Sequence, residues 1–355
     1  YADIVRKRSI LRQLISATSN INDTIFNPQG QSSEQILEFA EQTVFEIAEQ
    51  ETRGKKSYQN ISVYTDKVME MMQERAESEN PISGIRTGYH DLDKITAGFQ
   101  RSDLIIIAGR PAMGKSALAV NIAETAAIKD KHSVAIFSME MAAEQLTTRM
   151  MSSLANIDQQ KVKTGKLDGD DWIRFTSTVG ILQETKMFID DTPALTPAEL
   201  RARCRRISRE HGLDLVVVDY LQMMQVAGTS ENRATEISEI SRSLKAMAKE
   251  LNIPVIALSQ LNRSVEARQD KRPVMSDLRE SGAIEQDADV IIFIYRDEVY
   301  DQESSDKGMA EIIISKQRNG PIGFLKLTWR GQYTRFDNFV KDPLTYDSPS
   351  VGKHE

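Results

Sequence analysis

The feature that most constrains the fold is the run at residues 109–116, which reads Gly-Arg-Pro-Ala-Met-Gly-Lys-Ser and matches the pattern Gly-x4-Gly-Lys-Ser/Thr in full. An apolar run typical of a buried strand, residues 104–108, precedes it, and a helical pattern, residues 116–129, follows. Glycines let backbone N–H groups curl around phosphate oxygens, and a helix N-terminus favours negative charge. The motif with this context predicts a nucleoside triphosphate site.

The chemistry of phosphate binding assigns roles within and beyond this motif. The nucleotide is expected to lie against Gly109, Arg110, Pro111, Ala112, Met113, Gly114, Lys115, Ser116 and Ala117. Lys115 would reach the β- and γ-phosphates, and the Ser116 hydroxyl would bind Mg²⁺. The second carboxylate on the metal side should end a downstream apolar strand, and Asp219 ends the run at residues 213–219. Asp214, before that strand, is more typical of a cap or turn.

Two polar residues directly follow predicted strands. Glu140 comes after residues 134–137, at the edge where ligands bind in open α/β sheets, and is a candidate for orienting the attacking water. A glutamate near a helix N-terminus is also favoured by the helix dipole alone, so the residues leave both roles open. Gln260, just past residues 255–258, is a candidate sensor of the γ-phosphate.

Short apolar runs alternate with helical patterns through most of the chain. The runs are residues 104–108, 134–137, 215–218 and 255–258, and the helical patterns are residues 116–129, 142–155, 197–211 and 235–251. Such runs are typical of parallel strands covered on both faces. Further strands at residues 290–295 and 311–315 precede an antiparallel tail. The pattern predicts an α/β P-loop NTPase domain with a mostly parallel sheet over residues 85–340.

The residues before this domain have a helical pattern. Helices near residues 3–18 and 32–50, joined by a loop at 27–30, predict an α-helical hairpin within residues 1–53. A linker at residues 54–84 contains an amphipathic helix that begins near Ile61 and ends before Pro81. Its apolar stripe needs a partner surface in this chain or a neighbour. Residues 341–355 are polar and are expected to form a flexible tail.

Composition limits the classes of protein. The chain has 355 residues, with 45 Lys+Arg against 52 Asp+Glu and a net charge of −7, which excludes a protein that coats nucleic acid with its whole surface but allows local basic contacts. The one cysteine, Cys204, excludes a disulfide framework and predicts a cytoplasmic setting. No apolar run approaches the roughly 18 residues that cross a bilayer, so no membrane association is expected.

With these motifs in order, the chain resembles the DnaB family of bacterial replicative helicases, within the RecA-like ATPases. The resemblance is carried by residues 109–116, 138–141, 218–222, 259–263, 277–282 and 316–320. It covers residues 85–336, and the preceding helices resemble the hairpin and linker of the family. Because the chain begins at or just before that hairpin, we expect it to lack the globular N-terminal domain of the family.

The resemblance implies a homo-hexamer that uses ATP and Mg²⁺ to move 5′ to 3′ along single-stranded DNA and unwind duplex at the replication fork. A primase and a helicase loader are implied as partners. Glu140 would be the catalytic glutamate, Arg318 the arginine finger and Lys316 its companion. From the residues alone, the Asn319-Gly320 turn places these two cations at an outward-projecting hairpin tip, where they either complete a neighbour's site or are solvated.

For DNA, the resemblance points to two loops in a central channel. The first follows Asp219 and reaches Arg233, and the second contains Arg279, Glu280 and Gly282. An arginine with backbone amides would hold phosphates without reading bases, although Arg279 and Glu280 equally suit a surface salt bridge. The arginine-rich helix at residues 197–211 has an apolar stripe on its other face and is predicted to be a solvated or subunit-facing cover.

Two other classes share this kind of core. A RecA- or RadA-type recombinase is disfavoured, because a RadA-like protein would bring a four-cysteine zinc finger and a recombinase is not expected to carry the N-terminal hairpin and linker. A KaiC-like regulatory ATPase would bind protein rather than DNA. Stimulation of ATP hydrolysis by single-stranded DNA separates a helicase from the second class.

Overall fold

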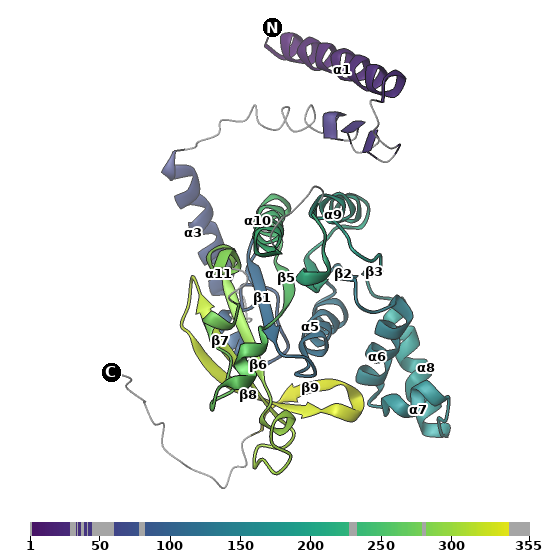
Figure 1. Cartoon of the computed structure of the whole chain (residues 1–355). Helices are drawn as coiled ribbons and strands as arrows, with labels where there is room; N and C mark the ends of the chain where they lie inside the picture. The colour runs from purple at the N-terminus through teal and green to yellow at the C-terminus, as the bar shows by residue number, and fades with distance from the viewer. Residues whose placement is uncertain are drawn as a thin grey trace. The chain divides into compact units, whose positions relative to one another are not determined.

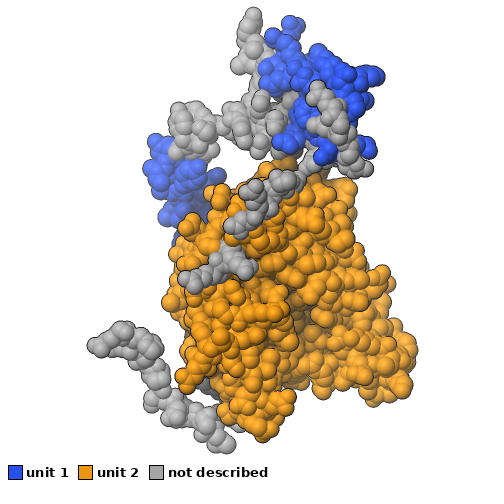
Figure 2. All heavy atoms as spheres, viewed as in Figure 1, with its two compact units in different colours: residues 1–79 blue, residues 80–355 orange. Residues whose placement is uncertain are grey.

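The computed structural model describes residues 2–28, 33, 35–36, 39–40, 42–44, 60–77, 82–226, 233–278 and 282–340. The chain divides into two compact units, residues 1–79 and 80–355, which Figure 2 colours separately. Most of the second hairpin helix predicted at residues 32–50, the predicted tail at 341–355 and residues 227–232 of the first DNA loop lie outside the described residues. The finer division of the chain into a hairpin, a linker, a core and a tail stays a prediction.

The larger unit is built on a nine-stranded sheet with the order β3-β2-β4-β5-β1-β6-β7-β8-β9 (Figure 1). The strands are β1 (Leu104–Gly109), β2 (Val134–Ser138), β3 (Met187–Asp190), β4 (Leu215–Asp219), β5 (Val255–Gln260), β6 (Val290–Tyr295), β7 (Met309–Gln317), β8 (Gly323–Arg330) and β9 (Arg335–Asn338). From β3 to β6 the neighbours are parallel, and β7, β8 and β9 add antiparallel strands. The predicted mostly parallel α/β sheet is confirmed.

Helices cover both faces of this sheet. They are α4 (His90–Thr96), α5 (Lys115–Glu124), α6 (Ala143–Ala155), α7 (Gln159–Thr164), α8 (Gly169–Gln183), α9 (Pro197–His211), α10 (Arg233–Leu251) and α11 (Gly282–Asp287). Alternate residues of β1 enter two different hydrophobic clusters, with Ile105 and Ile107 beside α5 and α6 and with Ile106 and Ala108 beside α9 and α10. This two-sided burial explains why the parallel strands are apolar throughout.

Some elements differ from the sequence prediction. The helix predicted at residues 116–129 is divided, because α5 ends at Glu124 and a π-helix, Thr125–Lys129, continues it. Between α6 and α9 the chain forms α7, α8 and the edge strand β3, none of which was predicted. Strand β3 has only four residues, all half-buried, which is too short for periodicity to reveal.

Three of the arginines of α9 form ion pairs within the chain. Arg201 and Arg205 form ion pairs with Glu250 of α10, and Arg203 pairs with Asp190 at the end of β3. These three side chains are half-buried and ion-paired rather than freely solvated, whereas Arg206 and Arg209 are exposed; the subunit-facing alternative stays a prediction. The arginines tie α9 to the neighbouring helix and strand, because carboxylates that a sequence pattern does not reveal lie opposite them.

In the smaller unit, α1 (Ala2–Phe26) is longer than the helix predicted at residues 3–18. It ends just before the Asn27-Pro28 pair, where proline disfavours helical backbone in the preceding residue. Helix α3 (Ile61–Glu77) corresponds to the predicted linker helix, and Ile61 and Val68 are exposed on it. Within the described residues, no helix is long and apolar enough to span a membrane.

Candidate active site

The predicted nucleotide-site residues gather at one edge of the sheet. Because β1, β2, β4 and β5 are parallel, their carboxyl ends lie together, and the register pairs Gly109 with Gln260 and Ser138 with Asp219. Glu140 follows two residues after Ser138 and is exposed at this edge. The structure thus brings together the phosphate-binding loop (residues 109–116, the P-loop) and three polar residues predicted from separate parts of the sequence.

Residues from the C-terminal part of the chain support the conformation of the P-loop. Gly114 has φ +98°, and a Cβ atom there would lie 2.8 Å from the ring of Phe336, so glycine is needed for both conformation and space. Arg296 donates a hydrogen bond to the Ala112 carbonyl (2.9 Å), and its guanidinium lies 4.6 Å from the centroid of the Trp329 ring. Sequence reasoning missed these three supports, because they are remote in the chain and belong to no recognised phosphate-binding motif.

Lys115 and Ser116 face the two carboxylates. Burial lowers the pKa of Lys115 to about 8, and the nearby Asp219 and Glu140 charges oppose that change. The Ser116 hydroxyl donates to the Asp219 carboxylate, whose pKa is raised by burial. A hydroxyl and a carboxylate side by side are the oxygen ligands that Mg²⁺ takes in nucleotide sites, so these two residues fit the predicted metal. Lys115 also donates to the Arg110 carbonyl (3.2 Å).

Some P-loop side chains face the protein interior. The Arg110 guanidinium donates to the Leu261 carbonyl (2.7 Å) and forms an ion pair with Glu266 (2.8 Å). Met113 and Ala117 are buried. These residues can therefore meet a nucleotide through their backbone groups, while their side chains fix the loop to its surroundings.

The carboxyl ends of β4 and β5 are linked by Gln222, for which the sequence predicted no role. The Gln222 amide nitrogen donates to the Ser259 hydroxyl (3.0 Å), and its amide oxygen accepts from the Gln260 N–H (3.2 Å). The side chain of Gln260 is exposed at the end of β5, as a γ-phosphate sensor requires. A link of this kind can transmit a shift of one strand end to the other.

A small cavity adjoins the helix that follows the P-loop. Ser116, Arg149, Ser153 and Thr334 contribute to its lining, together with the buried Glu124. Burial raises the pKa of the Glu124 carboxyl to about 8, although it accepts hydrogen bonds from Ser153 and from an asparagine of the same helix. Arg149 was not predicted from sequence. It is the cation of α6 whose charge acts on Asp219, so it adds positive potential beside the phosphate site.

Lys316 and Arg318 do not lie at the edge of the sheet where the P-loop lies. The predicted hairpin is confirmed, because residues 318–322 join the antiparallel strands β7 and β8, and Arg318 is exposed in this turn. Lys316 lies within β7, just before the turn, and the Arg318 N–H donates to the Asp289 carbonyl (2.9 Å). The β6–β7 register pairs Gln317 with Val290, the first residue of β6. Since β6 is parallel to β1, these cations lie at the amino end of the strands, and the P-loop lies at the carboxyl end. Five residue steps of β1 separate the two ends by about 17 Å.

Of the predicted DNA-binding residues, two are described. Arg233 begins α10, donates to the Gln222 carbonyl (2.7 Å) and forms an ion pair with Glu236. Gly282 begins α11. Arg279 and Glu280 lie outside the described residues.

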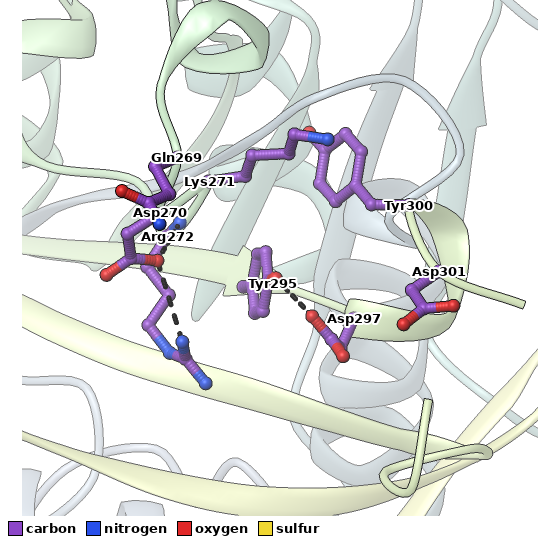
Figure 3. Close-up of a pocket in the computed structure, with 8 residues that line it drawn as sticks. All are labelled: Gln269, Asp270, Lys271, Arg272, Tyr295, Asp297, Tyr300 and Asp301. Carbon is purple, nitrogen blue, oxygen red and sulfur yellow. Dashed lines mark hydrogen bonds and ion pairs between the residues drawn. The ribbon is translucent and has the colours of Figure 1, made fainter. Parts of the chain in front are cut away.

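A separate pocket of about 510 Å³ opens beyond the end of β6 (Figure 3). Within it the Tyr295 hydroxyl donates to Asp297, and Arg272 pairs with Asp270 and lies 5.0 Å from the centroid of the Tyr295 ring. Arg272 also forms an ion pair with Glu311. Since its charges are matched among themselves, this pocket is a poor candidate for a phosphate site despite its size.

Comparison with known proteins agrees with this arrangement. The family model of the DnaB-like helicase C terminal domain matches residues 84–338. The chain belongs to the DnaB family of replicative DNA helicases. The replicative DNA helicase DnaB of Pasteurella multocida is 53% identical over 346 residues, which are 96% of this chain and 74% of that protein. The DnaB of Geobacillus stearothermophilus is 48% identical over 343 residues, with shares of 96% and 75%.

Two solved structures have the same fold. One, described as an ATPase domain, aligns with a TM-score of 0.76 at 37% identity and covers 80% of this chain and 100% of that one. The other, a DnaB-like replicative helicase described with its interactions with primase, aligns with a TM-score of 0.80 at 33% identity and covers 96% and 77%. Membership of the DnaB family sets aside the recombinase and regulatory-ATPase hypotheses.

We expect nucleotide affinity to fall as pH rises above 8. Phosphates bind the cationic form of Lys115, whose pKa without nucleotide is about 8. Between pH 7.5 and 8 the affinity should therefore change little, and above that it should fall by up to about tenfold per pH unit. The measurement is the Kd of a fluorescent ATP analogue between pH 7.5 and 9.5. Lys115→Arg is the control, because its guanidinium stays charged and should remove the dependence. A wild-type curve that is flat to pH 9.5 contradicts the assignment.

Proposed function

We propose that the chain is the motor subunit of a homo-hexameric ring in which ATP hydrolysis at subunit interfaces drives 5′ to 3′ movement on single-stranded DNA and unwinding at the replication fork. The observation that carries the proposal is the separation of Lys316 and Arg318 from the P-loop along β1. Roughly 17 Å is beyond the reach of an arginine side chain, so these cations suit a neighbour's nucleotide. A site shared between subunits requires an oligomer, and a closed ring is its usual form.

Within each composite site, the residues of one subunit bind and activate the nucleotide. Lys115 and the P-loop N–H groups would hold the β- and γ-phosphates, while Ser116 and Asp219 would hold Mg²⁺. When bound, Mg²⁺ neutralises charge on the phosphate oxygens. Glu140 is exposed at the same edge and close enough to interact with Lys115 and Asp219, which supports its role in orienting and deprotonating water. Gln260 would report the presence of the γ-phosphate.

The neighbouring subunit would supply the remaining charge. Arg318 would stabilise the negative charge that develops on the transferred phosphoryl group, and Lys316 would contact the same phosphate. For DNA, we propose that Arg233, Arg279, Glu280 and Gly282 mark the loops that hold the single strand by its phosphates, without sequence preference. DNA movement would then follow from the order in which neighbouring sites hydrolyse ATP.

Partners and location follow from the family. A primase is proposed as a partner, since the similar DnaB-like helicase structure is described with its primase interactions. A helicase loader is proposed from family resemblance. The single cysteine, Cys204, is buried, and the chain suits a reducing compartment such as the cytoplasm.

Single-stranded DNA should stimulate ATP hydrolysis several-fold. Phosphate contacts weaken steeply with salt, so oligo-dT should be tested at low ionic strength, with blunt duplex DNA as the control. On tailed duplexes, unwinding should require a 5′ single-stranded tail, because only that tail allows 5′ to 3′ movement. Hydrolysis that no DNA stimulates at low salt would contradict the DNA-driven motor. Unwinding from a 3′ tail alone would contradict the proposed polarity.

A further inference from the structure

One buried residue, Asp289, contacts Arg318 twice, through its backbone carbonyl and through an ion pair of its carboxylate. Asp289 directly precedes β6 and is 5% exposed. Its carbonyl accepts from the Arg318 N–H (2.9 Å), and its Oδ1 lies 3.5 Å from Arg318 Nε. Its Oδ2 accepts from the Leu104 N–H (2.7 Å), at the start of β1. Arg318 is thereby fixed to the central strand of its own subunit.

Charges around Asp289 are balanced in a small buried network. Lys245 of α10 donates to Oδ2 of Asp289 and to the Ser102 carbonyl (2.8 Å). Burial and the Asp289 charge raise the pKa of the neighbouring Asp103 to about 6. Removing the Asp289 charge would leave Lys245 half-buried and opposite no carboxylate of comparable closeness among the described residues, and would also remove the ion pair of Arg318.

The end of α11 holds the same two cations from the other side. Lys316 Nζ donates to the carbonyls of Glu285 and Ala288, the latter at 2.7 Å, and Arg318 Nη2 donates to the Gln286 carbonyl (2.6 Å). These carbonyls are neutral acceptors, so they hold the two cations without neutralising their charge. The carboxylate of Asp289 adds a negative charge beside Nε of Arg318, and this charge fixes the position of that part of the side chain.

We propose that Asp289 is the positioning residue of the arginine finger, which sets the point and direction from which Arg318 reaches a neighbouring subunit. The inference rests on the proposed trans role of Arg318. Asp289 lies at the amino end of β1, remote from the P-loop of its own subunit. Its loss should therefore slow hydrolysis at the neighbour's site and leave nucleotide binding at its own P-loop unchanged.

Asp214 offers a matched control. It directly precedes β4, its N–H donates to the Ser133 carbonyl (2.8 Å), and its carboxylate accepts from the Ser133 N–H (2.9 Å). Asp289 makes the same pair of bonds to Leu104, with the N–H donating at 2.9 Å. The ion pair recorded for Asp214 is with His132 (3.5 Å) rather than with an arginine. Asp214→Asn therefore measures the loss of a strand-start bond without disturbing the finger.

The test compares Asp289→Asn and Asp214→Asn in the full chain. Asp289→Asn should lower kcat for ATP at least tenfold with KM within about twofold, whereas Asp214→Asn should keep kcat within about twofold. Co-expression of Asp289→Asn with Lys115→Ala should restore activity, because an intact P-loop then meets an intact finger. Random mixing in a ring makes about a quarter of the sites complete. A purely structural defect inside the subunit would not be rescued in this way.

Each outcome is decisive. The positioning role is overturned if Asp289→Asn has the kcat of the wild type. It is also overturned if Lys115→Ala rescues Arg318→Ala but does not rescue Asp289→Asn. In both cases the finger assignment of Arg318 stands. If Arg318→Ala is not rescued either, the trans finger itself fails. Should Asp289→Asn not fold, Asp289→Glu keeps the charge but displaces it by one methylene. It should show reduced kcat with the same rescue, and a wild-type rate in that variant contradicts the inference.

Discussion

Replacing Lys115 with alanine is expected to abolish ATP hydrolysis without unfolding the protein. The substitution removes the charge at the β- and γ-phosphates. Loss of one preorganised group that stabilises transition-state charge typically lowers kcat by about 10²–10³-fold. The fold should survive, because Lys115 Nζ donates a single hydrogen bond, to the Arg110 carbonyl (3.2 Å), and the side chain lies at the edge of the sheet. Steady-state ATPase rates and circular dichroism measure the two parts of the prediction.

Lys161→Ala is a suitable control for that experiment. Lys161 also pairs with two carboxylates, Asp168 and Asp171, but it lies on α7, outside the nucleotide site. Lys161 is itself exposed, and the buried Asp171 keeps its ion pair with Arg174, so the ATPase rate of Lys161→Ala should stay close to that of the wild type. A Lys115→Ala protein that keeps more than about a tenth of the wild-type rate would be incompatible with the assigned role.

Arg318→Ala should be as inactive as Lys115→Ala, yet for a reason that lies in the neighbouring subunit. An arginine finger supplied in trans contributes about 10³–10⁵ in kcat. Arg318 lies at the amino end of the strands, as the Gln317–Val290 pairing shows, and therefore cannot serve its own P-loop. We expect nucleotide binding to be retained and turnover to be lost. Binding of the fluorescent analogue and the ATPase rate distinguish these two effects.

Mixing the two inactive proteins tests the trans site directly. When Arg318→Ala and Lys115→Ala subunits are co-expressed, about a quarter of the interfaces of a randomly mixed ring should combine an intact P-loop with an intact finger. Activity well above that of either parent is the expected result. A mixture no more active than its parents would rule out the finger. Arg330→Ala, which breaks an exposed pair with Asp337 on the same antiparallel segment, should be active by itself.

The parts of the site that depend on contiguous residues could be predicted from the sequence. The P-loop needs a strand, a glycine turn and a helix in succession, so residues 104–129 show it directly. Asp219 and Glu140 could be placed because both end apolar strands, and parallel strands bring their carboxyl ends together. The alternation of strands and helices predicts that these strands are parallel. It therefore predicts at which edge of the sheet each strand ends, without any knowledge of side-chain contacts.

The supports of the site could not be predicted, because they depend on the order of strands across the sheet. Phe336 meets Gly114 only because β9 runs back to the P-loop helix, and Asp289 meets Arg318 only through the pairing of β6 with β7. An aromatic residue or a strand-start aspartate has no distinctive sequence pattern. The hairpin expected at Asn319-Gly320 is present, but turn chemistry does not predict what packs against it, and the contacts of Lys316 and Arg318 with α11 and Asp289 were therefore missed.

The contact between Gly114 and Phe336 has a consequence for protein synthesis. Phe336, which supports the P-loop, is translated 222 residues after Gly114. At 5–20 residues per second this interval is roughly ten to forty seconds. Strand β1 also cannot pair within the sheet until its two neighbours, β5 and β6, have been translated. During that interval the nascent P-loop lacks its support, so cellular ATP cannot serve as a folding template until Phe336 has been translated.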